Sequence, residues 1–150
     1  MSLTEKDSQY LWHPYTQHKT ASAPIAITKG KGAILWDENG KEYIDAIASW
    51  WVNPYGHSNT FIADAIYKQL TTLEHVLFGG FTHEPAVEVA EKLVTILPNN
   101  QQKLFFSDNG STAVEIAIKV ALQFFFNKGE KRTTIIAFEN AFHGDTFAAM

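Results

Sequence analysis

The chain has 150 residues, with 12 basic and 16 acidic side chains and a formal charge of −4. Its 45% hydrophobic and 19% charged residues are typical of a folded protein and too apolar for a disordered one. The mild acidity, without any run of Lys or Arg, argues against a nucleic-acid partner, and no apolar run approaches the roughly 18 residues of a membrane span. A chain of this length is expected to bury about two-thirds of its unfolded surface.

Cysteine is absent, which excludes disulfides, thiolate catalysis and a Cys-ligated metal. Its absence also fits a reducing compartment, and residues 1–7 lack the apolar stretch of a secretory signal, so we expect a cytoplasmic protein. The histidines show no metal-ligand spacing, and we therefore assign no metal.

The N-terminal 56 residues are expected to hold one short helix and then a small antiparallel unit. Pro14 keeps His13 out of helical geometry, so the helix should end before that residue. Residues 25–48 contain apolar runs around a first turn at 30–32 and a second at Asp37–Gly40, whose Asn-Gly pair is typical of a hairpin because both residues tolerate positive φ. An aromatic loop follows over residues 49–57.

Two amphipathic helices are predicted after this loop. Ser58 or Asn59 can cap the first, whose apolar residues recur at helical spacing to about Leu73. The second begins near Thr82 or Pro85 and runs to Leu97, before Pro98.

A third helix, from about Thr112 to Phe126, is predicted between two strands at residues 103–107 and 133–138. Thr112 and Glu115 fit a capping box, and the helix is apolar on nearly all sides, which predicts burial against a sheet. Strand, helix and strand in this order indicate a parallel crossover, and hence an α/β fold. The loop that ends at Met150 has no element after it to pack beneath it, so we expect the chain to be the front part of a longer protein.

The loop Ser107–Thr112 is the sharpest candidate for a binding site. It joins the end of a predicted strand to a helix N-terminus, where unpaired N–H groups and a partial positive charge attract anions. Gly110 lets the backbone approach an anion, and the hydroxyls of Ser111 and Thr112 can donate to it, so the loop can form a phosphate cup. An ordinary capped helix with a Gly turn explains the same short string, and the string alone favours that simpler interpretation.

A second candidate is Phe142-His143-Gly144-Asp145, which follows the second predicted strand. Loops at the carboxyl ends of parallel strands share one edge of the sheet, so this loop is expected beside Gly110, where the Phe142 ring could stack on a planar cofactor. A core Phe next to a turn is the alternative. The aromatic strings around Tyr15 and Trp50 are more often core or interface anchors than ligand walls, and no Ser-His-acid arrangement follows from spacing.

Together, five strings resemble the N-terminal third of the class III pyridoxal-phosphate (PLP) aminotransferases, and within them the biotin-pathway branch. These strings are Trp12–Thr16, Ser49–Trp51, His75–His83, Asp108–Glu115 and His143–Phe147. The resemblance implies a fold type I PLP transferase with a mostly parallel sheet covered by helices. It also implies a small-domain segment at residues 1–56 and the start of the large PLP-binding domain at residues 57–150.

The same resemblance implies site roles. Gly110 and Ser111 would bind the PLP phosphate, Phe142 would lie against the pyridine ring, and Trp50 and Tyr15, with Phe142, would wall the substrate pocket. Leu77 and Gly79, from the string His75–His83, would enter the partner's site in a homodimer. The family usually has Tyr where this chain has Phe142, so we expect altered substrate affinity with cofactor binding retained.

The reaction implied is transfer of an amino group from S-adenosylmethionine to 8-amino-7-oxononanoate, giving 7,8-diaminononanoate. No lysine here stands in the context of the family's Schiff-base Lys, so the 150-residue chain alone should be inactive, with no catalytic residue of its own. Two alternatives are another class III ω-aminotransferase and a noncatalytic phosphate-binding domain.

Overall fold

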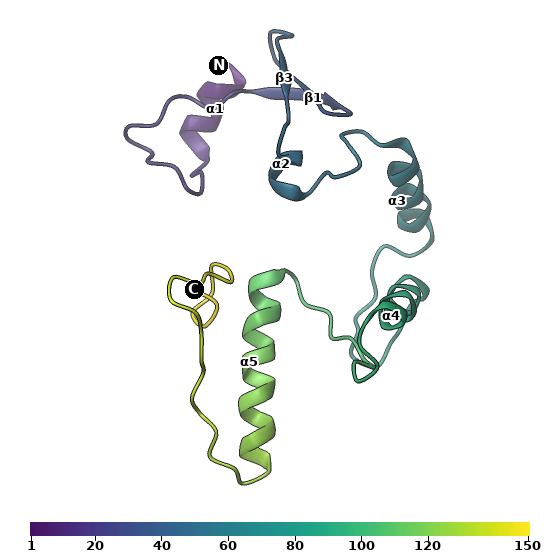
Figure 1. The fold of residues 1–150 in the computed structure, drawn as a ribbon. Helices are drawn as coiled ribbons and strands as arrows, with labels where there is room; N and C mark the ends of the chain where they lie inside the picture. Colours follow the sequence, from purple (N-terminus) through teal and green to yellow (C-terminus); the bar gives the residue numbers. More distant parts are fainter. The chain divides into compact units, whose positions relative to one another are not determined.

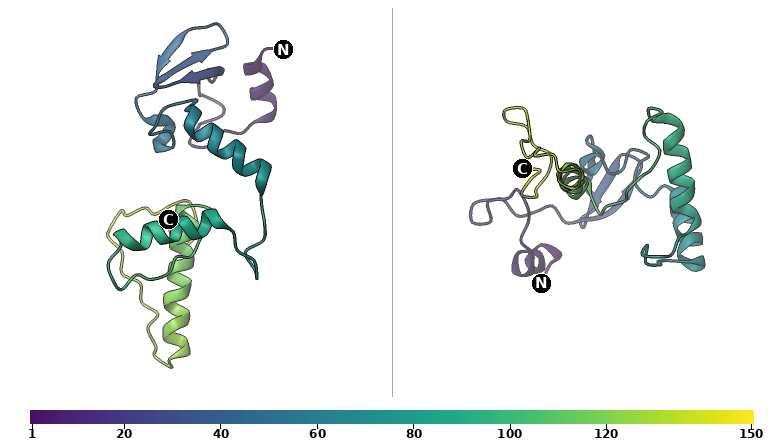
Figure 2. Two further views of the ribbon diagram at one scale, coloured as in Figure 1. Left: turned by 90° about the vertical axis from the view of Figure 1, so that its right-hand side faces the viewer. Right: turned by 90° about the horizontal axis from the view of Figure 1, so that it is seen from below.

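The computed structural model describes residues 1–150, which divide into two compact units, residues 1–76 and 77–150 (Figure 1). The first unit holds three helices and a small sheet, and the second holds two helices and extended connections, as the further views show (Figure 2). The element order is α1 (Leu3–Tyr10), β1 (Ile27–Lys31), β2 (Ile34–Asp37), β3 (Glu42–Ile44), α2 (Ala48–Trp51), α3 (Thr60–Thr72), α4 (Glu84–Ile96) and α5 (Gly110–Asn127). The expected domain boundary at residues 56 and 57 concerns a complete protein and stays a prediction. No helix is both long and apolar enough to span a bilayer.

The helix expected before Pro14 is α1. Ser2 caps it reciprocally: Ser2 Oγ accepts from the Glu5 N–H at 3.1 Å, and Glu5 Oε2 accepts from the Ser2 N–H at 2.7 Å. After the helix ends, the His13 ring lies 2.9 Å from Asp7 Oδ2 and ties the following loop back to α1.

The antiparallel unit predicted for residues 25–48 is confirmed as a three-stranded sheet in the order β1-β2-β3. Its second turn carries Gly40 at φ +81°, as the Asn-Gly signal predicts. The first turn, expected at residues 30–32, consists of Gly32 at φ +58° and Ala33, because Gly30 and Lys31 belong to β1. Trp36 pairs with Glu42 across β2 and β3, and its indole N–H donates to Glu42 Oε1 at 3.0 Å.

Both amphipathic helices form close to their predicted bounds. Of the two candidate caps for α3, Asn59 serves, because its Oδ1 accepts from the Ile62 N–H at 3.3 Å. Pro85 lies in the first turn of α4, where its missing N–H costs nothing. Pro98 follows directly after Leu97, the C-cap of α4.

The predicted start of α5 at Thr112 is wrong, since the helix begins at Gly110. Asn109 is the N-cap: its Oδ1 accepts from the Thr112 N–H at 3.0 Å, and the Thr112 Oγ1 accepts from the Asn109 N–H at 3.2 Å. This reciprocal pair uses the short Asn side chain one turn earlier than the Thr-Glu pair that the sequence suggested. Glu115 therefore takes no part in the cap, and its carboxylate accepts hydrogen bonds from Thr146 and Ala148 instead.

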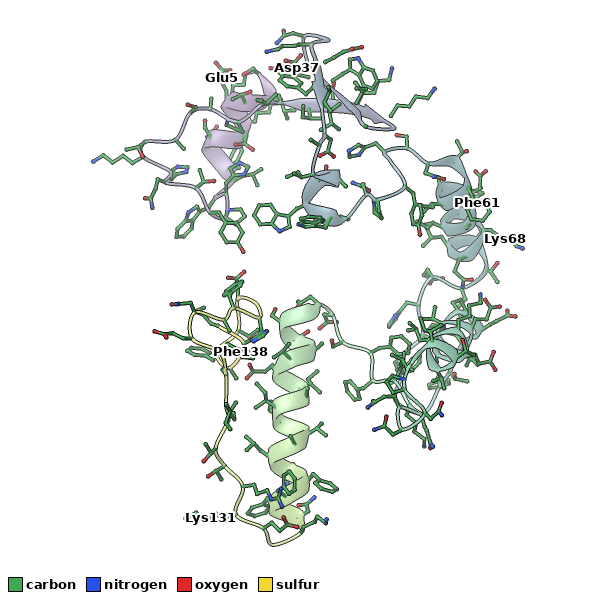
Figure 3. All side chains as sticks on the ribbon, in the orientation of Figure 1. Glu5, Asp37, Phe61, Lys68, Lys131 and Phe138 are labelled. Atoms are coloured by element: carbon green, nitrogen blue, oxygen red, sulfur yellow. The ribbon has the colours of Figure 1, made fainter.

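The strands predicted at residues 103–107 and 133–138 do not form within this chain, whose one sheet is β1-β2-β3. A parallel ladder needs a neighbouring strand, and none pairs with either segment. The second segment returns beside α5 from the turn at Lys131 to Phe138 (Figure 3), and it leaves Ile136 94% and Phe138 90% exposed.

A closed core, expected from the chain length, is also absent. Ala149 is the one buried hydrophobic residue, and α5, which was expected to be buried on most sides, contains no buried residue. The reason is that α5 and its flanking segments present apolar faces that no other part of residues 1–150 covers.

Candidate cofactor and substrate site

The first candidate site is the N-terminus of α5. The N–H of Thr112 is used by the Asn109 cap, whereas the N–H groups of Gly110 and Ser111 have no acceptor within the chain. A Cβ added to Gly110 would meet nothing within 4 Å, so an anion can approach this backbone closely. Two free amides at the positive end of an 18-residue helix fit a phosphate group.

The Ser111 hydroxyl has a partner in this structure, because it donates to Asn109 Oδ1 at 2.7 Å. Binding a phosphate would require this hydroxyl to turn away from Asn109 and donate to the anion instead. The Asn109 cap keeps its bond to the Thr112 N–H in either case. The cup therefore consists of two backbone donors and one hydroxyl that can be redirected.

The loop after residue 138 packs against this cup, as the sequence predicts for the Phe142 loop. Gly144 approaches Ser111 so closely that a Cβ added to Gly144 would lie 2.9 Å from Ser111 Cα. Thr146 Oγ1 donates to Glu115 Oε2 at 3.2 Å, and the Ala148 N–H donates to the same oxygen at 3.0 Å. Glu115 therefore fixes the loop that carries Phe142, whose ring is 60% exposed.

Two of the three residues expected to wall a substrate pocket, Tyr15 and Trp50, lie together in the first unit. The Tyr15 and Trp50 rings are stacked, with centroids 5.7 Å apart and planes 10° from parallel. Both side chains remain largely exposed on their other faces, so the stack presents a flat aromatic surface.

The segment expected to enter a partner's site lies at the start of the second unit. Phe78 contacts His83 and Phe106 edge-on, at centroid distances of 5.3 and 6.0 Å, and so anchors this stretch. A Cβ added to Gly79 would lie 2.9 Å from Leu77 Cδ1, which shows that these two residues are in close contact.

The segment that carries Trp50 has an unusual backbone. All four residues of α2 have positive φ, from +47° to +71°, and none is glycine. The Trp51 N–H donates to the Ile47 carbonyl at 2.9 Å and the Val52 N–H to the Ala48 carbonyl, so α2 is one left-handed helical turn. For L-residues this conformation costs roughly 1–2 kcal/mol each, and it persists only where neighbouring contacts impose it.

A polar cluster that the sequence did not reveal lies at the start of this turn. Asp45 Oδ1 accepts from the Ser49 N–H at 2.9 Å, while Oδ2 accepts from the Ser49 hydroxyl at 2.7 Å and lies 2.7 Å from His57 Nε2. These bonds, the one from the Ser49 N–H first, lower the pKa of Asp45 from 3.8 to about 2. The i,i+4 spacing of Asp45 and Ser49 is the one signal in the sequence, and it is too common to identify a site.

The cluster is not a Ser-His-Asp catalytic triad. In a triad, the His receives the Ser proton on one ring nitrogen and donates from the other to the Asp. Here the Ser49 hydroxyl donates to Asp45, and the same His57 nitrogen faces both residues, at 2.7 Å from Asp45 and 3.4 Å from Ser49 Oγ. The arrangement therefore activates no nucleophile.

Comparison with known proteins identifies the family to which this chain belongs. The profile of the aminotransferase class-III family matches residues 15–150. The chain belongs to the class III aminotransferases.

Its relatives within the class III aminotransferases include the adenosylmethionine-8-amino-7-oxononanoate aminotransferase of Synechococcus elongatus, 52% identical over 94% of this chain and 33% of the relative. A crystal structure of the enzyme of that name from Methanocaldococcus jannaschii superposes with a TM-score of 0.90 at 41% identity, over 96% of this chain and 34% of that one. The crystal structure of an omega transaminase from Pseudomonas jessenii in complex with PMP superposes with a TM-score of 0.80 at 36% identity. The match covers 86% of this chain and 29% of that one.

The chain spans about a third of the length of these relatives. The predicted fold class is confirmed, since the structure neighbours are class III transaminases and the small antiparallel sheet with its helices occurs in the same arrangement. Residues 103–107, residues 133–138 and α5 all lie within the region that matches the class III family.

Proposed function

We propose that the complete protein transfers an amino group from S-adenosylmethionine to 8-amino-7-oxononanoate in biotin synthesis. The observation that carries this proposal is the 52% identity to a relative named for that reaction, over 94% of the chain. The stack of Tyr15 on Trp50 supports it, because these residues belong to two of the five strings by which the sequence resembles the biotin-pathway branch.

The residues present fit pyridoxal phosphate. The amides of Gly110 and Ser111 would hold its phosphate, with the positive end of α5 opposing the phosphate charge. Phe142, on the loop that Gly144 seats against Ser111, would lie against the pyridine ring. When bound, PLP supplies the electron sink for amino transfer, and the Schiff-base Lys lies outside residues 1–150.

The substrate side of the site consists of Tyr15 and Trp50. Their stacked rings offer an apolar surface to the aliphatic chain of 8-amino-7-oxononanoate and exclude water from it. Phe142, which the family resemblance also assigns to the substrate pocket, lacks the phenol hydroxyl of the usual family Tyr, so it cannot donate a hydrogen bond to the substrate.

We further propose that the enzyme is a cytoplasmic homodimer in which Leu77 and Gly79 reach the partner's site. The support is the anchoring of this stretch by Phe78 against Phe106, which leaves Leu77 56% exposed. The dimer is tested by light scattering of the complete protein, where a monomer would contradict it.

The second candidate is a class III ω-transaminase with another amino donor, favoured by the TM-score of 0.80 to the Pseudomonas jessenii omega transaminase. The test mixes the complete, PLP-loaded protein with 8-amino-7-oxononanoate and either S-adenosylmethionine or 4-aminobutyrate, and measures 7,8-diaminononanoate by mass spectrometry. Product from S-adenosylmethionine is expected. Turnover with other ω-amines alone would favour the second candidate, and absence of visible PLP absorbance would indicate a noncatalytic phosphate-binding domain.

A further inference from the structure

We infer that Asp45 is a positioning residue for the substrate wall: with Ser49 and His57 it imposes the left-handed turn that sets Trp50 against Tyr15. The inference rests on the proposed function in one respect, that the stacked rings face the substrate. It adds three polar residues, none of which touches the substrate, to the determinants of specificity.

The first step is that Asp45 caps the turn. The leading N–H groups of a left-handed turn have no partner within it, and the Ser49 N–H donates to Asp45 Oδ1 at 2.9 Å. The Ser49 hydroxyl donates to the other oxygen at 2.7 Å, so both donors of Ser49 are held by one carboxylate. The side chain of Asp45 is only 6% exposed, which protects these bonds from water.

The second step is that the cap is fixed to the sheet. The Asp45 N–H donates to the Ala33 carbonyl at 2.8 Å, directly after β3. His57 exchanges two backbone hydrogen bonds with Gly32 at 2.8 and 3.0 Å, and its ring lies against Gly30, where a Cβ would come within 2.9 Å. The carboxylate is thus held between two points of the β1–β2 hairpin.

The third step connects the cap to the ring. Trp50 follows Ser49 directly, at φ +68° and ψ +48°, and this backbone conformation directs its side chain to the Tyr15 ring. A non-glycine residue leaves the left-handed region unless its surroundings hold it there. Loss of the Asp45 acceptors would therefore let the turn relax and would move Trp50 off Tyr15.

The test is a double-mutant cycle in the complete PLP-loaded enzyme. Asp45→Asn keeps one acceptor for the Ser49 N–H but places an amide where the Ser49 hydroxyl and His57 bind. We expect the KM for 8-amino-7-oxononanoate to rise roughly three- to tenfold, while kcat changes by less than about twofold and the visible PLP spectrum is unchanged. In a Trp50→Ala background, Asp45→Asn should raise KM no further, because the ring that it positions is gone.

Asp37→Asn is the matched control. Asp37 accepts bonds from the N–H groups of Asn39 and Lys41 and from the Tyr43 hydroxyl, at the end of the sheet far from α2 (Figure 3). The same chemical change there should alter stability but not KM. If Asp45→Asn does not fold, Ser49→Ala, which removes only the hydroxyl bond, is carried through the same cycle.

The outcomes are distinguishable. An unchanged KM in Asp45→Asn, with a raised KM in Trp50→Ala, would overturn the positioning role and leave the proposed function intact. Additive effects of the two substitutions would also overturn it, because Asp45 would then act independently of Trp50. An unchanged KM in Trp50→Ala would refute the role of Trp50 in the proposed function, and the inference would fail with it.

Discussion

Gly144 is the position at which the packing of the two cofactor loops can be tested most directly. In a Gly144→Ala variant, the new Cβ would lie 2.9 Å from Ser111 Cα and closer still to Ser111 Cβ, whereas ordinary van der Waals contact begins near 3.4 Å. Neither neighbour is the flexible end of a side chain, so the loop or the start of α5 must move by at least half an ångström. The φ of +129° adds a strain of about 1–3 kcal/mol, and overpacking adds about 1–3 kcal/mol more.

If Ser111 binds the PLP phosphate as proposed, this displacement should weaken PLP binding by roughly tenfold or more. The assay titrates PLP into the complete apoprotein and follows its visible absorbance. Gly129→Ala is the control, since Gly129 also has positive φ, +72°, but no atom within 4 Å of the added Cβ. It should lower stability without changing PLP affinity. Equal PLP affinity in the two variants would refute the packing of Gly144 on a cofactor cup.

Three other predictions concern single side chains. Phe142→Tyr should change the KM for the substrates while the PLP spectrum stays the same, because the ring remains and a phenol hydroxyl is gained; unchanged kinetics would count against a substrate role. Asn109→Ala should lower the free energy of unfolding by about 1 kcal/mol through loss of the α5 cap, measured by urea denaturation; no change would mean that this cap is dispensable. Since the pKa of Asp45 is lowered from 3.8 to about 2, its contribution to stability is complete above about pH 4 and is lost as the pH falls towards 2. Urea midpoints between pH 5 and 2 should therefore fall more steeply in the wild type than in Asp45→Asn, and parallel curves would contradict this.

Local patterns predicted the elements whose stability is local. The hydrophobic spacing of α3 and its Asn59 cap, and the hairpin turn at Gly40, depend on neighbours within a few residues, so the sequence was sufficient for them. The start of α5 was misplaced because both Asn109 and Thr112 are N-cap residues by type, and the capping box that forms is Asn109 with Thr112, not Thr112 with Glu115. The strands at residues 103–107 and 133–138 carry a strand composition, but pairing depends on a neighbour that the local pattern cannot supply.

The candidate site likewise contains features that the sequence predicted and features that it did not. The Gly110 loop and the neighbouring Phe142 loop followed from their positions after predicted strands, and the contact of Gly144 with Ser111 bears out their adjacency. The roles of Tyr15 and Trp50 came only from resemblance. The cluster around Asp45 could not be predicted, because His57 joins it across 12 residues through a backbone bridge to Gly32.

The left-handed turn of α2 has a consequence for directed evolution. Ala48 is held at φ +49°, where glycine avoids a steric penalty of roughly 1–2 kcal/mol and forfeits about 0.5–1 kcal/mol of chain entropy. Ala48→Gly is therefore a candidate for modest thermostabilisation, yet it also widens the range of backbone angles next to the aromatic wall. Selection for heat tolerance would therefore favour Gly at this position, whereas selection for substrate specificity would favour Ala.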